Sequence, residues 1–340
     1  MPFRTKRFLI GLSSFFIAAQ LLAFQPGWTQ IDVPGATQDA PSTKVALYYP
    51  TQAEPRAVPM GPFTVNAAIR AEPEPTVKAL IMLSHGTGGT ELGHSRLAEA
   101  LARSGYLVAA LRHPGDNWQD TSLLTRTPER YFDVRPRQVS RVIDALLLDP
   151  RWKDRIARDA RGPRIGAVGH SAGGYTVLAL AGGEPDRSRL IRHCQEEGAE
   201  DPLCCSLGRS GQTPAPSAPA PAGTPLKDPR VRAVVALAPM GVVFSAESLA
   251  RIQVPTAIWE AELDRFLVPR FHAEWIARNM PRAELHRVPN AWHFAFLDTP
   301  SVPIPSPDGD LGANPPGFDR AAFLKQLGGD LTAFFDQAFK

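Results

Sequence analysis

The chain has 340 residues, of which 44% are apolar and 21% are charged. A chain of this length and apolar content can bury a large core, which excludes wholesale disorder. The net charge of +3 reflects 37 bases against 34 acids, but three of the bases lie within residues 4–7 and no acid precedes Asp32. The remainder of the chain is balanced in charge, which argues against a nucleic-acid-binding protein.

Residues 1–24 are typical of a signal peptide. A short basic segment with Arg4, Lys6 and Arg7 precedes a mostly apolar run at 8–24. This pattern predicts a secreted or periplasmic protein, with an uncleaved membrane anchor as the alternative. No later apolar run reaches the roughly 18 residues that suggest a membrane span, so no stable membrane insertion is expected after cleavage.

The next segment, residues 25–42, is rich in proline, glycine and glutamine and predicts a flexible lead-in. Beyond it, short apolar runs predict strands at 43–49, 62–69, 77–83, 106–111, 164–168, 231–237, 256–259 and 283–288. Apolar residues at helical spacing predict helices at 91–104, 136–147, 173–181, 271–280 and 318–339. Pro136 is expected to open its helix, and Gly328-Gly329 to break the last one before a new N-cap at Asp330.

Strands that alternate with helices are typical of βαβ units. The sequence therefore predicts one α/β domain over residues 43–340, with a mostly parallel central sheet and helices on both faces. An insertion at 184–229 interrupts the pattern and is expected to lie over the carboxyl edge of the sheet. It contains a proline- and alanine-rich stretch at 211–225 that cannot pack a core.

All three cysteines lie in this insertion. An oxidising compartment would allow a disulfide from Cys194 to either Cys204 or Cys205, with one thiol left over. A zinc site is less favoured, because His193 is the one nearby histidine and the spacing matches no common zinc pattern. The chain also lacks the sequence fingerprints of nucleotide-binding loops and zinc proteases, so the sequence predicts neither a cofactor nor a metal.

The strongest chemical signal is Gly169-His170-Ser171-Ala172-Gly173. It has the form Gly-x-Ser-x-Gly and lies between a predicted strand and a predicted helix. A strained turn of this kind raises the serine hydroxyl above the sheet edge, and side chains at the flanking glycine positions would clash. The helix amino terminus beneath it favours a developing negative charge. The motif predicts Ser171 as a nucleophile.

A serine nucleophile needs a base, and the base needs an acid that orients it. In this architecture the chain order is serine, acid, histidine. His272 falls within a predicted helix and His286 within a predicted strand, whereas His293 lies in a loop just beyond a strand. His293 is therefore the predicted base.

The acid should follow the preceding strand, at 256–259. Asp264 is the predicted acid, because its short side chain in the loop before Val268 can hold an imidazole in one tautomer. Glu260 and Glu262 follow the same strand and are the alternatives.

Stabilising the oxyanion requires backbone N–H groups. One is predicted from Ala172, the residue after the nucleophile. The other is predicted from the turn at 84–89, where Thr87 is the expected donor and Gly88 the alternative. His85 lies in the same turn but precedes Ser171 in the chain, so it is expected to order the loop rather than to act as the base.

These motifs resemble the α/β-hydrolase superfamily and, within it, the exported predicted dienelactone hydrolases related to platelet-activating-factor acetylhydrolases. The resemblance covers roughly residues 60–300 and rests on motifs at 60–63, 83–89, 113–117, 135–136, 169–174 and 293–297. It implies the α/β-hydrolase fold, serine-dependent cleavage of a carboxylic ester, and a disulfide between Cys194 and Cys204. True dienelactone hydrolases use a cysteine nucleophile, whereas this chain has Ser171.

The expected function is thus an exported serine hydrolase that cleaves a small-molecule or lipid-like ester through Ser171, His293 and Asp264. The same triad also serves amidases and peptidases, because acyl transfer is common to all of them. A non-catalytic binding protein on the same fold is a further alternative.

Overall fold

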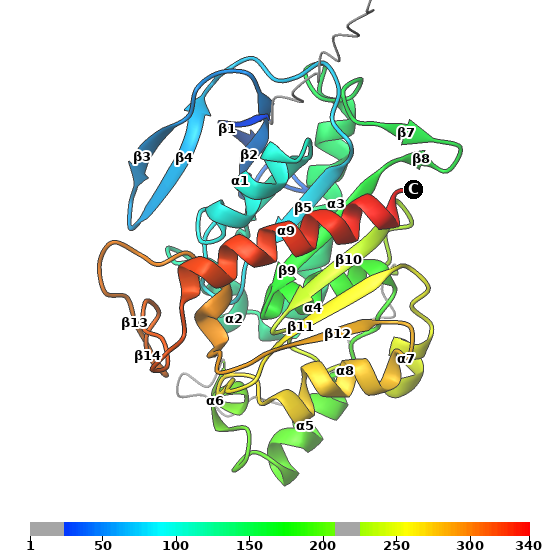
Figure 1. Ribbon diagram of the computed structural model, residues 1–340. Helices are drawn as coiled ribbons and strands as arrows, with labels where there is room; N and C mark the ends of the chain where they lie inside the picture. Colours follow the sequence, from blue (N-terminus) through cyan, green and yellow to red (C-terminus); the bar gives the residue numbers. More distant parts are fainter. Residues whose placement is uncertain (1–23, 208–224) are drawn as a thin grey trace, which may run out of the picture.

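A ten-stranded sheet runs through the centre of the molecule, in the order β12-β11-β10-β9-β5-β6-β2-β1-β4-β3 (Figure 1). The computed structural model describes residues 24–207 and 225–340. Six neighbouring strands are mutually parallel. They are β5 (Leu80–Ser84), β6 (Leu107–Arg112), β9 (Ile165–His170), β10 (Val231–Leu237), β11 (Thr256–Ala261) and β12 (Glu284–Val288). The predicted α/β class with a mostly parallel sheet is confirmed.

The other end of the sheet is largely antiparallel. β2 pairs antiparallel with both β6 and β1, and β4 pairs antiparallel with β3 and parallel with β1. These strands are β1 (Gln25–Val33), β2 (Thr43–Thr51), β3 (Arg56–Met60) and β4 (Phe63–Ile69). The sequence patterns indicate β2 and β4 but not β3.

The prediction of a flexible lead-in at 25–42 is wrong for its first nine residues, which form β1. β1 pairs with β2 along its whole length and supplies the partners that the backbone of this buried strand requires. Gly27 lets β1 pair closely with β2 beside Tyr49, because a Cβ atom at position 27 would lie 2.3 Å from the ring of Tyr49. The glycine marks a close approach in a strand rather than a loose segment.

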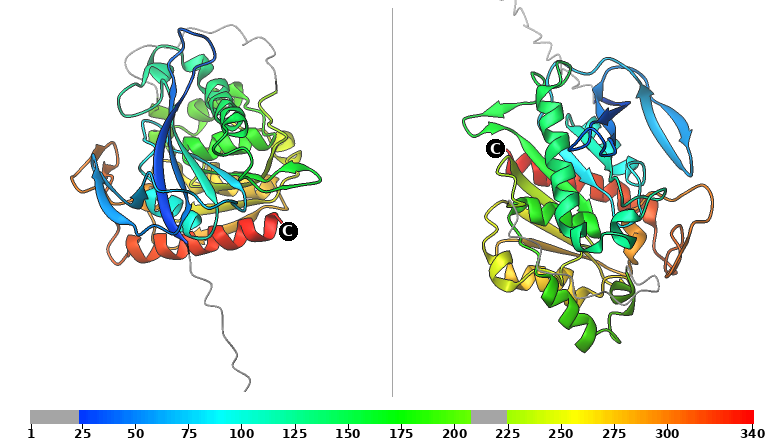
Figure 2. Two further views of the ribbon diagram at one scale, coloured as in Figure 1. Left: turned by 90° about the horizontal axis from the view of Figure 1, so that it is seen from above. Right: turned by 180° about the vertical axis from the view of Figure 1, so that it is seen from behind.

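Helices cover both faces of the sheet (Figure 2). On one face lie α1 (Ser95–Arg103) and α9 (Arg320–Ala338), and on the other α3 (Tyr131–Leu148), α4 (Ala172–Ala181) and α8 (Ala273–Asn279). Alternate residues of β5 enter the two cores: Leu80 and Met82 join one cluster, Ile81 and Leu83 the other. Burial on both faces explains why the parallel strands are continuous apolar runs.

Shorter elements connect these layers. The helices are α2 (Ser122–Thr125) and α7 (Ala246–Ala250), with 3-10 turns η1 (Pro128–Arg130), η2 (Pro269–Phe271) and η3 (His293–Phe296). Two small hairpins pair β7 (Arg158–Asp159) with β8 (Gly162–Pro163), and β13 (Pro305–Ser306) with β14 (Gly309–Asp310). Within the described residues, no helix is both long enough and apolar enough to span a bilayer.

Two predicted helix boundaries are wrong. α3 begins at Tyr131, so Pro136 lies inside the helix instead of opening it. Proline has no N–H for the carbonyl four residues earlier, and that carbonyl, of Phe132, accepts the Tyr175 hydroxyl at 2.8 Å instead.

α9 is unbroken, so Asp330 is an interior residue and not an N-cap. Gly328 lies against α1, where a Cβ would come within 2.7 Å of the Ala100 Cβ. Gly328 therefore allows the two helices to approach closely, and the Gly328-Gly329 pair does not end the helix.

The described part of the insertion forms α5 (Arg187–Glu196) and α6 (Pro202–Ser206), while most of the 211–225 stretch lies outside the described residues. A disulfide joins Cys194 to Cys205, and Cys204 is free and buried. The Cys194–Cys204 pairing that the resemblance implied is therefore wrong. Consecutive helical residues point about 100° apart, so α6 presents Cys205 to α5 while Cys204 packs into the core.

Candidate active site

Ser171 lies at the tight turn between β9 and α4, as the motif predicted. Its φ of 58° and ψ of −118° are strained for a residue with a side chain. The glycines around it are sterically required. A Cβ on Gly173 would lie 1.9 Å from the Ser84 carbonyl oxygen, and a Cβ on Gly169 would lie 2.0 Å from the Gly173 oxygen. The Ser171 N–H is anchored to the carbonyl of Leu237 at 2.9 Å.

His293 and Asp264, predicted from chain order and from their positions in loops after strands, are in direct contact. His293 Nδ1 donates to Asp264 Oδ2 at 2.6 Å, and both side chains are buried. The other oxygen of Asp264 accepts the N–H groups of Phe266 and Leu267 at 2.8 and 2.9 Å. Because Nδ1 carries the proton, neutral His293 has its lone pair on Nε2, the tautomer that a general base needs.

The loop of His293 is also tied to the turn at Ser171. His170, which directly precedes Ser171, donates from Nε2 to the His293 carbonyl at 3.0 Å, and the two rings lie 4.9 Å apart. Burial, with the nearby His293 next in importance, holds the pKa of His170 well below its usual value. His170 is thus a neutral support that joins β9 to η3.

The alternative acids have other partners. Glu260 pairs with Arg287 at 2.7 Å, and Glu262 accepts the backbone N–H of Asn290 at 2.8 Å. The alternative bases also lie elsewhere. His286 stacks on Trp259, and His272 donates to Asp201 at 2.9 Å.

The turn expected to supply an oxyanion donor lies against Ser171, since a Cβ on Gly86 would be 3.0 Å from the Ser171 Cβ. Gly88 was the alternative donor, but its N–H is already bonded to Asp116 Oδ1 at 2.8 Å. That contact favours Thr87 in this turn. Ala172, predicted as the second donor, is the first residue of α4.

His85 has no ring nitrogen available to act as a base. Its Nδ1–H donates to the Gly86 carbonyl at 2.6 Å, and its Nε2 accepts the N–H of His113 at 3.1 Å. Burial, reinforced by the Arg135 charge, lowers the pKa of His85 to about 4. The prediction that His85 orders the loop agrees with these contacts.

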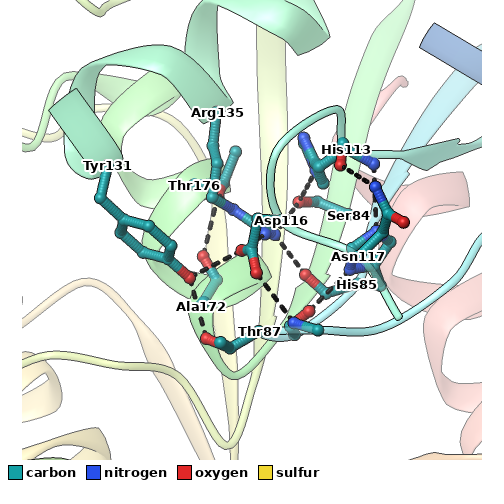
Figure 3. Close-up of polar contacts among 12 residues, drawn as sticks. Ser84, His85, Thr87, His113, Asp116, Asn117, Tyr131, Arg135, Ala172 and Thr176 are labelled. Atoms are coloured by element: carbon teal, nitrogen blue, oxygen red, sulfur yellow. Dashed lines mark hydrogen bonds and ion pairs between the residues drawn. The ribbon is translucent and has the colours of Figure 1, made fainter. Parts of the chain in front are cut away.

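Sequence reasoning missed two side chains that contact this turn. Tyr131 bonds the Thr87 side chain, and Arg135 pairs with Asp116 (Figure 3). The available signal was Arg135 itself. It lies four residues before Val139 and hence on the apolar face of its helix, where a charged residue needs a buried partner.

Buried groups of metal-ligand type from the insertion and from the start of α8 gather around Asp201, close enough together to share an ion. The hydrogen bonds describe them differently. His272 Nδ1 accepts the N–H of Gly241 at 3.0 Å, so its proton is on Nε2, which donates to Asp201. His193 donates to the same carboxylate oxygen at 2.8 Å, and Cys205 is in the disulfide. The two histidines and Asp201 thus form a hydrogen-bonded cluster, and the buried free thiol of Cys204 lies beside it.

The family model described as "Alpha/beta hydrolase family" matches residues 80–303. The chain belongs to this family. The match covers β5, the serine turn, and both Asp264 and His293. The resemblance that the sequence motifs indicated is therefore confirmed for the superfamily.

Individual proteins of the family share shorter or more distant similarity with this chain. A stretch of 111 residues is 32% identical to cutinases est1 and est2 of Thermobifida alba and covers 33% of this chain. The chain thus matches about a third of these relatives' length, 33% and 32% respectively.

Among solved structures, a ferulic acid esterase from Streptomyces cinnamoneus aligns with a TM-score of 0.58 at 21% identity, covering 94% of this chain and 91% of that one. A dienelactone hydrolase from Anabaena variabilis aligns with a TM-score of 0.48 at 15% identity, covering 92% and 98%. The esterase structure supports the α/β-hydrolase fold.

Proposed function

We propose that this protein is an exported serine hydrolase that cleaves a carboxylic ester through Ser171, His293 and Asp264. The observation that carries the proposal is the buried bond from His293 Nδ1 to Asp264, beside the strained serine turn. The names of the relatives favour an ester substrate, since they include cutinases and a ferulic acid esterase. The basic and apolar leader at 1–24 favours export.

The reaction begins when His293 Nε2 takes the proton from the Ser171 hydroxyl. Ser171 Oγ then attacks the ester carbonyl carbon, and the carbonyl oxygen becomes an oxyanion. The N–H groups of Thr87 and Ala172 donate to that oxyanion, and the amino terminus of α4 favours its charge. Asp264 stays ionised and stabilises the imidazolium of His293.

The tetrahedral intermediate collapses with cleavage of the bond to the alcohol oxygen, and protonated His293 gives its proton to the departing alkoxide. Ser171 is left as an acyl ester. Neutral His293 then removes a proton from water, which attacks the acyl carbonyl. Collapse of the second intermediate releases the carboxylic acid and restores the Ser171 hydroxyl with the proton held by His293.

The substrate class we propose is a small-molecule or lipid-like ester. A direct test compares residues 25–340 as wild type, Ser171→Ala and the matched control Ser206→Ala, whose serine is exposed on α6. Each protein is treated with a fluorophosphonate probe and assayed on p-nitrophenyl esters of increasing acyl length. Labelling and turnover in wild type and Ser206→Ala, both absent in Ser171→Ala, are the expected result.

Other outcomes point to the alternatives. A folded wild type that is neither labelled nor active would contradict the catalytic proposal and favour a binding protein on the hydrolase fold. Labelling without ester turnover would keep Ser171 as the nucleophile and favour an amidase or peptidase. Export is tested separately by expressing the full chain and sequencing the amino terminus of protein outside the cytoplasm; full-length protein retained inside the cell would contradict it.

A further inference from the structure

One buried guanidinium joins the two segments that carry the proposed oxyanion donors. Arg135 of α3 is fully buried and donates to the Asp116 carboxylate and to the His85 carbonyl (Figure 3). It also donates to the Ser84 hydroxyl at 3.2 Å and, from Nε, to the Thr176 hydroxyl of α4 at 3.1 Å. Arg135 thus contacts the turn after β5 and the helix that follows the nucleophile.

In the turn after β5, the Asp116 carboxylate holds Thr87 in place through two hydrogen bonds, one to the next residue and one to Tyr131. Asp116 Oδ1 accepts the N–H of Gly88 at 2.8 Å, and Oδ2 accepts the Tyr131 hydroxyl at 2.8 Å. Because the Tyr131 hydroxyl donates its one proton to the carboxylate, the Thr87 hydroxyl must be the donor in its 2.8 Å bond to Tyr131. Thr87 is therefore held by its own side chain and by the N–H of the next residue.

On the side of the helix, Thr176 completes the connection. Its hydroxyl donates to the Ala172 carbonyl at 2.8 Å and accepts from Arg135. The residue that carries the second proposed donor is thereby linked to the guanidinium through one side chain. The positions of Thr87 and Ala172 are both set relative to Arg135, through Asp116 and Tyr131 in one direction and through Thr176 in the other.

Stability alone is a weak explanation for this arrangement. Arg135 and Asp116 are both fully buried, and replacing such ion pairs with apolar residues is often neutral or even stabilising. Tyr131 is buried too, and burial, with the Asp116 charge next in importance, raises the pKa of its hydroxyl well above the usual value. Tyr131 therefore remains a neutral donor throughout the working range of an esterase.

We propose that Arg135, Asp116 and Tyr131 are positioning residues that set the spacing of the two oxyanion donors. The inference rests on the proposed esterase function. None of the three needs to touch substrate. Their contribution is preorganisation, because donors fixed before the reaction stabilise the oxyanion without a cost of reorientation in the transition state.

The first test is Tyr131→Phe, which keeps the ring and removes the bonds to Thr87 and Asp116. We expect kcat to fall by up to about 100-fold, the lower end of what removal of an oxyanion donor costs, while KM changes little. Tyr106→Phe is the matched control, because Tyr106 donates a similar bond to Asp336 on α9. It should leave kcat unchanged.

A trifluoromethyl ketone provides a readout that a merely structural role would not affect. Ser171 Oγ adds to its carbonyl carbon, His293 takes the proton, and the carbonyl oxygen becomes an oxyanion in the same site. If Arg135, Asp116 and Tyr131 position the donors, the inhibition constant of the ketone should rise in Tyr131→Phe by the same factor by which kcat/KM falls. Unchanged inhibition and unchanged kcat would overturn the inference.

A double-mutant cycle tests the path from Tyr131 to Thr87. Thr87→Val removes the hydroxyl at nearly constant shape and should reproduce the loss in Tyr131→Phe. The double variant should be no worse than either single one, and Thr87→Ser should recover most of the loss. Additive losses would overturn the inference. Absence of fluorophosphonate labelling in the wild type would instead mean that the proposed function itself has failed.

Discussion

Asp201 accepts a hydrogen bond from His272 at 2.9 Å, between residues that lie 71 positions apart in the chain. The same oxygen accepts His193, and the second oxygen accepts the N–H of Val268 at 3.4 Å. Val268 and Asp264 both lie in the loop that follows β11. The inserted segment is therefore joined both to the start of α8 and to the loop that carries the proposed catalytic acid.

Replacing the proposed acid should impair the chemical step. Asp264→Asn keeps the side-chain shape but removes the charge that stabilises the imidazolium of His293, and kcat should fall by roughly 1000-fold or more. Glu262→Gln is the control, because Glu262 follows the same strand and accepts the Asn290 N–H instead of a histidine. Steady-state kinetics on a p-nitrophenyl ester measures both. Equal losses in the two variants would contradict the assignment of Asp264.

Two glycine-to-alanine changes should act in opposite directions. A Cβ on Gly173 would overlap the Ser84 carbonyl oxygen at 1.9 Å, so Gly173→Ala should destabilise the protein and abolish activity.

Gly329 is exposed in α9, and a Cβ added there would meet no atom within 4 Å. Gly329→Ala should therefore raise the free energy of unfolding by about 0.5–1 kcal/mol. Urea unfolding checks both, and destabilisation by Gly329→Ala would show that α9 needs a glycine there.

The disulfide should stabilise the insertion and the domain. Closing a loop with a sequence separation of 11 is worth about 2–3 kcal/mol, chiefly by restricting the unfolded chain. Cys194→Ser should therefore lower the unfolding free energy by that amount and make stability insensitive to dithiothreitol. Cys204→Ser, which leaves the bond intact, should keep the response to reductant. A reductant response retained in Cys194→Ser would contradict the Cys194–Cys205 pairing.

Asp298 should make stability depend on pH. It is buried, with Oδ2 accepting the Arg96 N–H at 3.0 Å and Oδ1 lacking a partner among the described residues. Burial raises its pKa to about 7, against roughly 3.9 in an unfolded chain. At pH values between these two pKa values, Asp298 keeps a proton in the folded protein that it has lost in the unfolded chain. The unfolding free energy therefore falls as the pH rises through this range.

Asp298→Asn cannot ionise and should flatten that slope. The difference in unfolding free energy between the variant and wild type should shift in favour of the variant, by on the order of 2 kcal/mol, from pH 5 to pH 8. Asp330→Asn changes an exposed carboxylate on α9 and serves as the control. Urea unfolding at the two pH values measures the difference. Parallel profiles for wild type and Asp298→Asn would contradict a raised pKa at this carboxyl.

The parallel half of the sheet and the central residues of the site were predictable because their requirements are local. A strand buried on both faces must be a continuous apolar run, as at β5 and β10. The turn at Ser171 needs glycines at fixed positions. Chain order and placement in loops just beyond strands then favoured His293 and Asp264, which the structure brings into contact.

The features that the sequence did not reveal depend on partners distant in the chain. Gly27 and Gly328 lie in stretches whose composition suggests a flexible segment or a helix break, but their reasons are the ring of Tyr49 and the methyl of Ala100. Arg135, on the apolar face of its helix, indicates a buried partner, but the identity of that partner follows only from the way the turns near Ser84 and Asp116 meet it. In each case the determining fact is a contact that no local pattern encodes.

The position of β1 bears on where the polypeptide can be shortened. β1 starts at Gln25, one residue after the segment expected to be removed, and it lies inside the sheet between β2 and β4. A fragment that started at Thr43 would leave β2 and β4 with unpaired backbone groups, an open template for association with other chains. Trimming the proline- and glycine-rich residues that follow the leader would thus promote aggregation of the shortened protein.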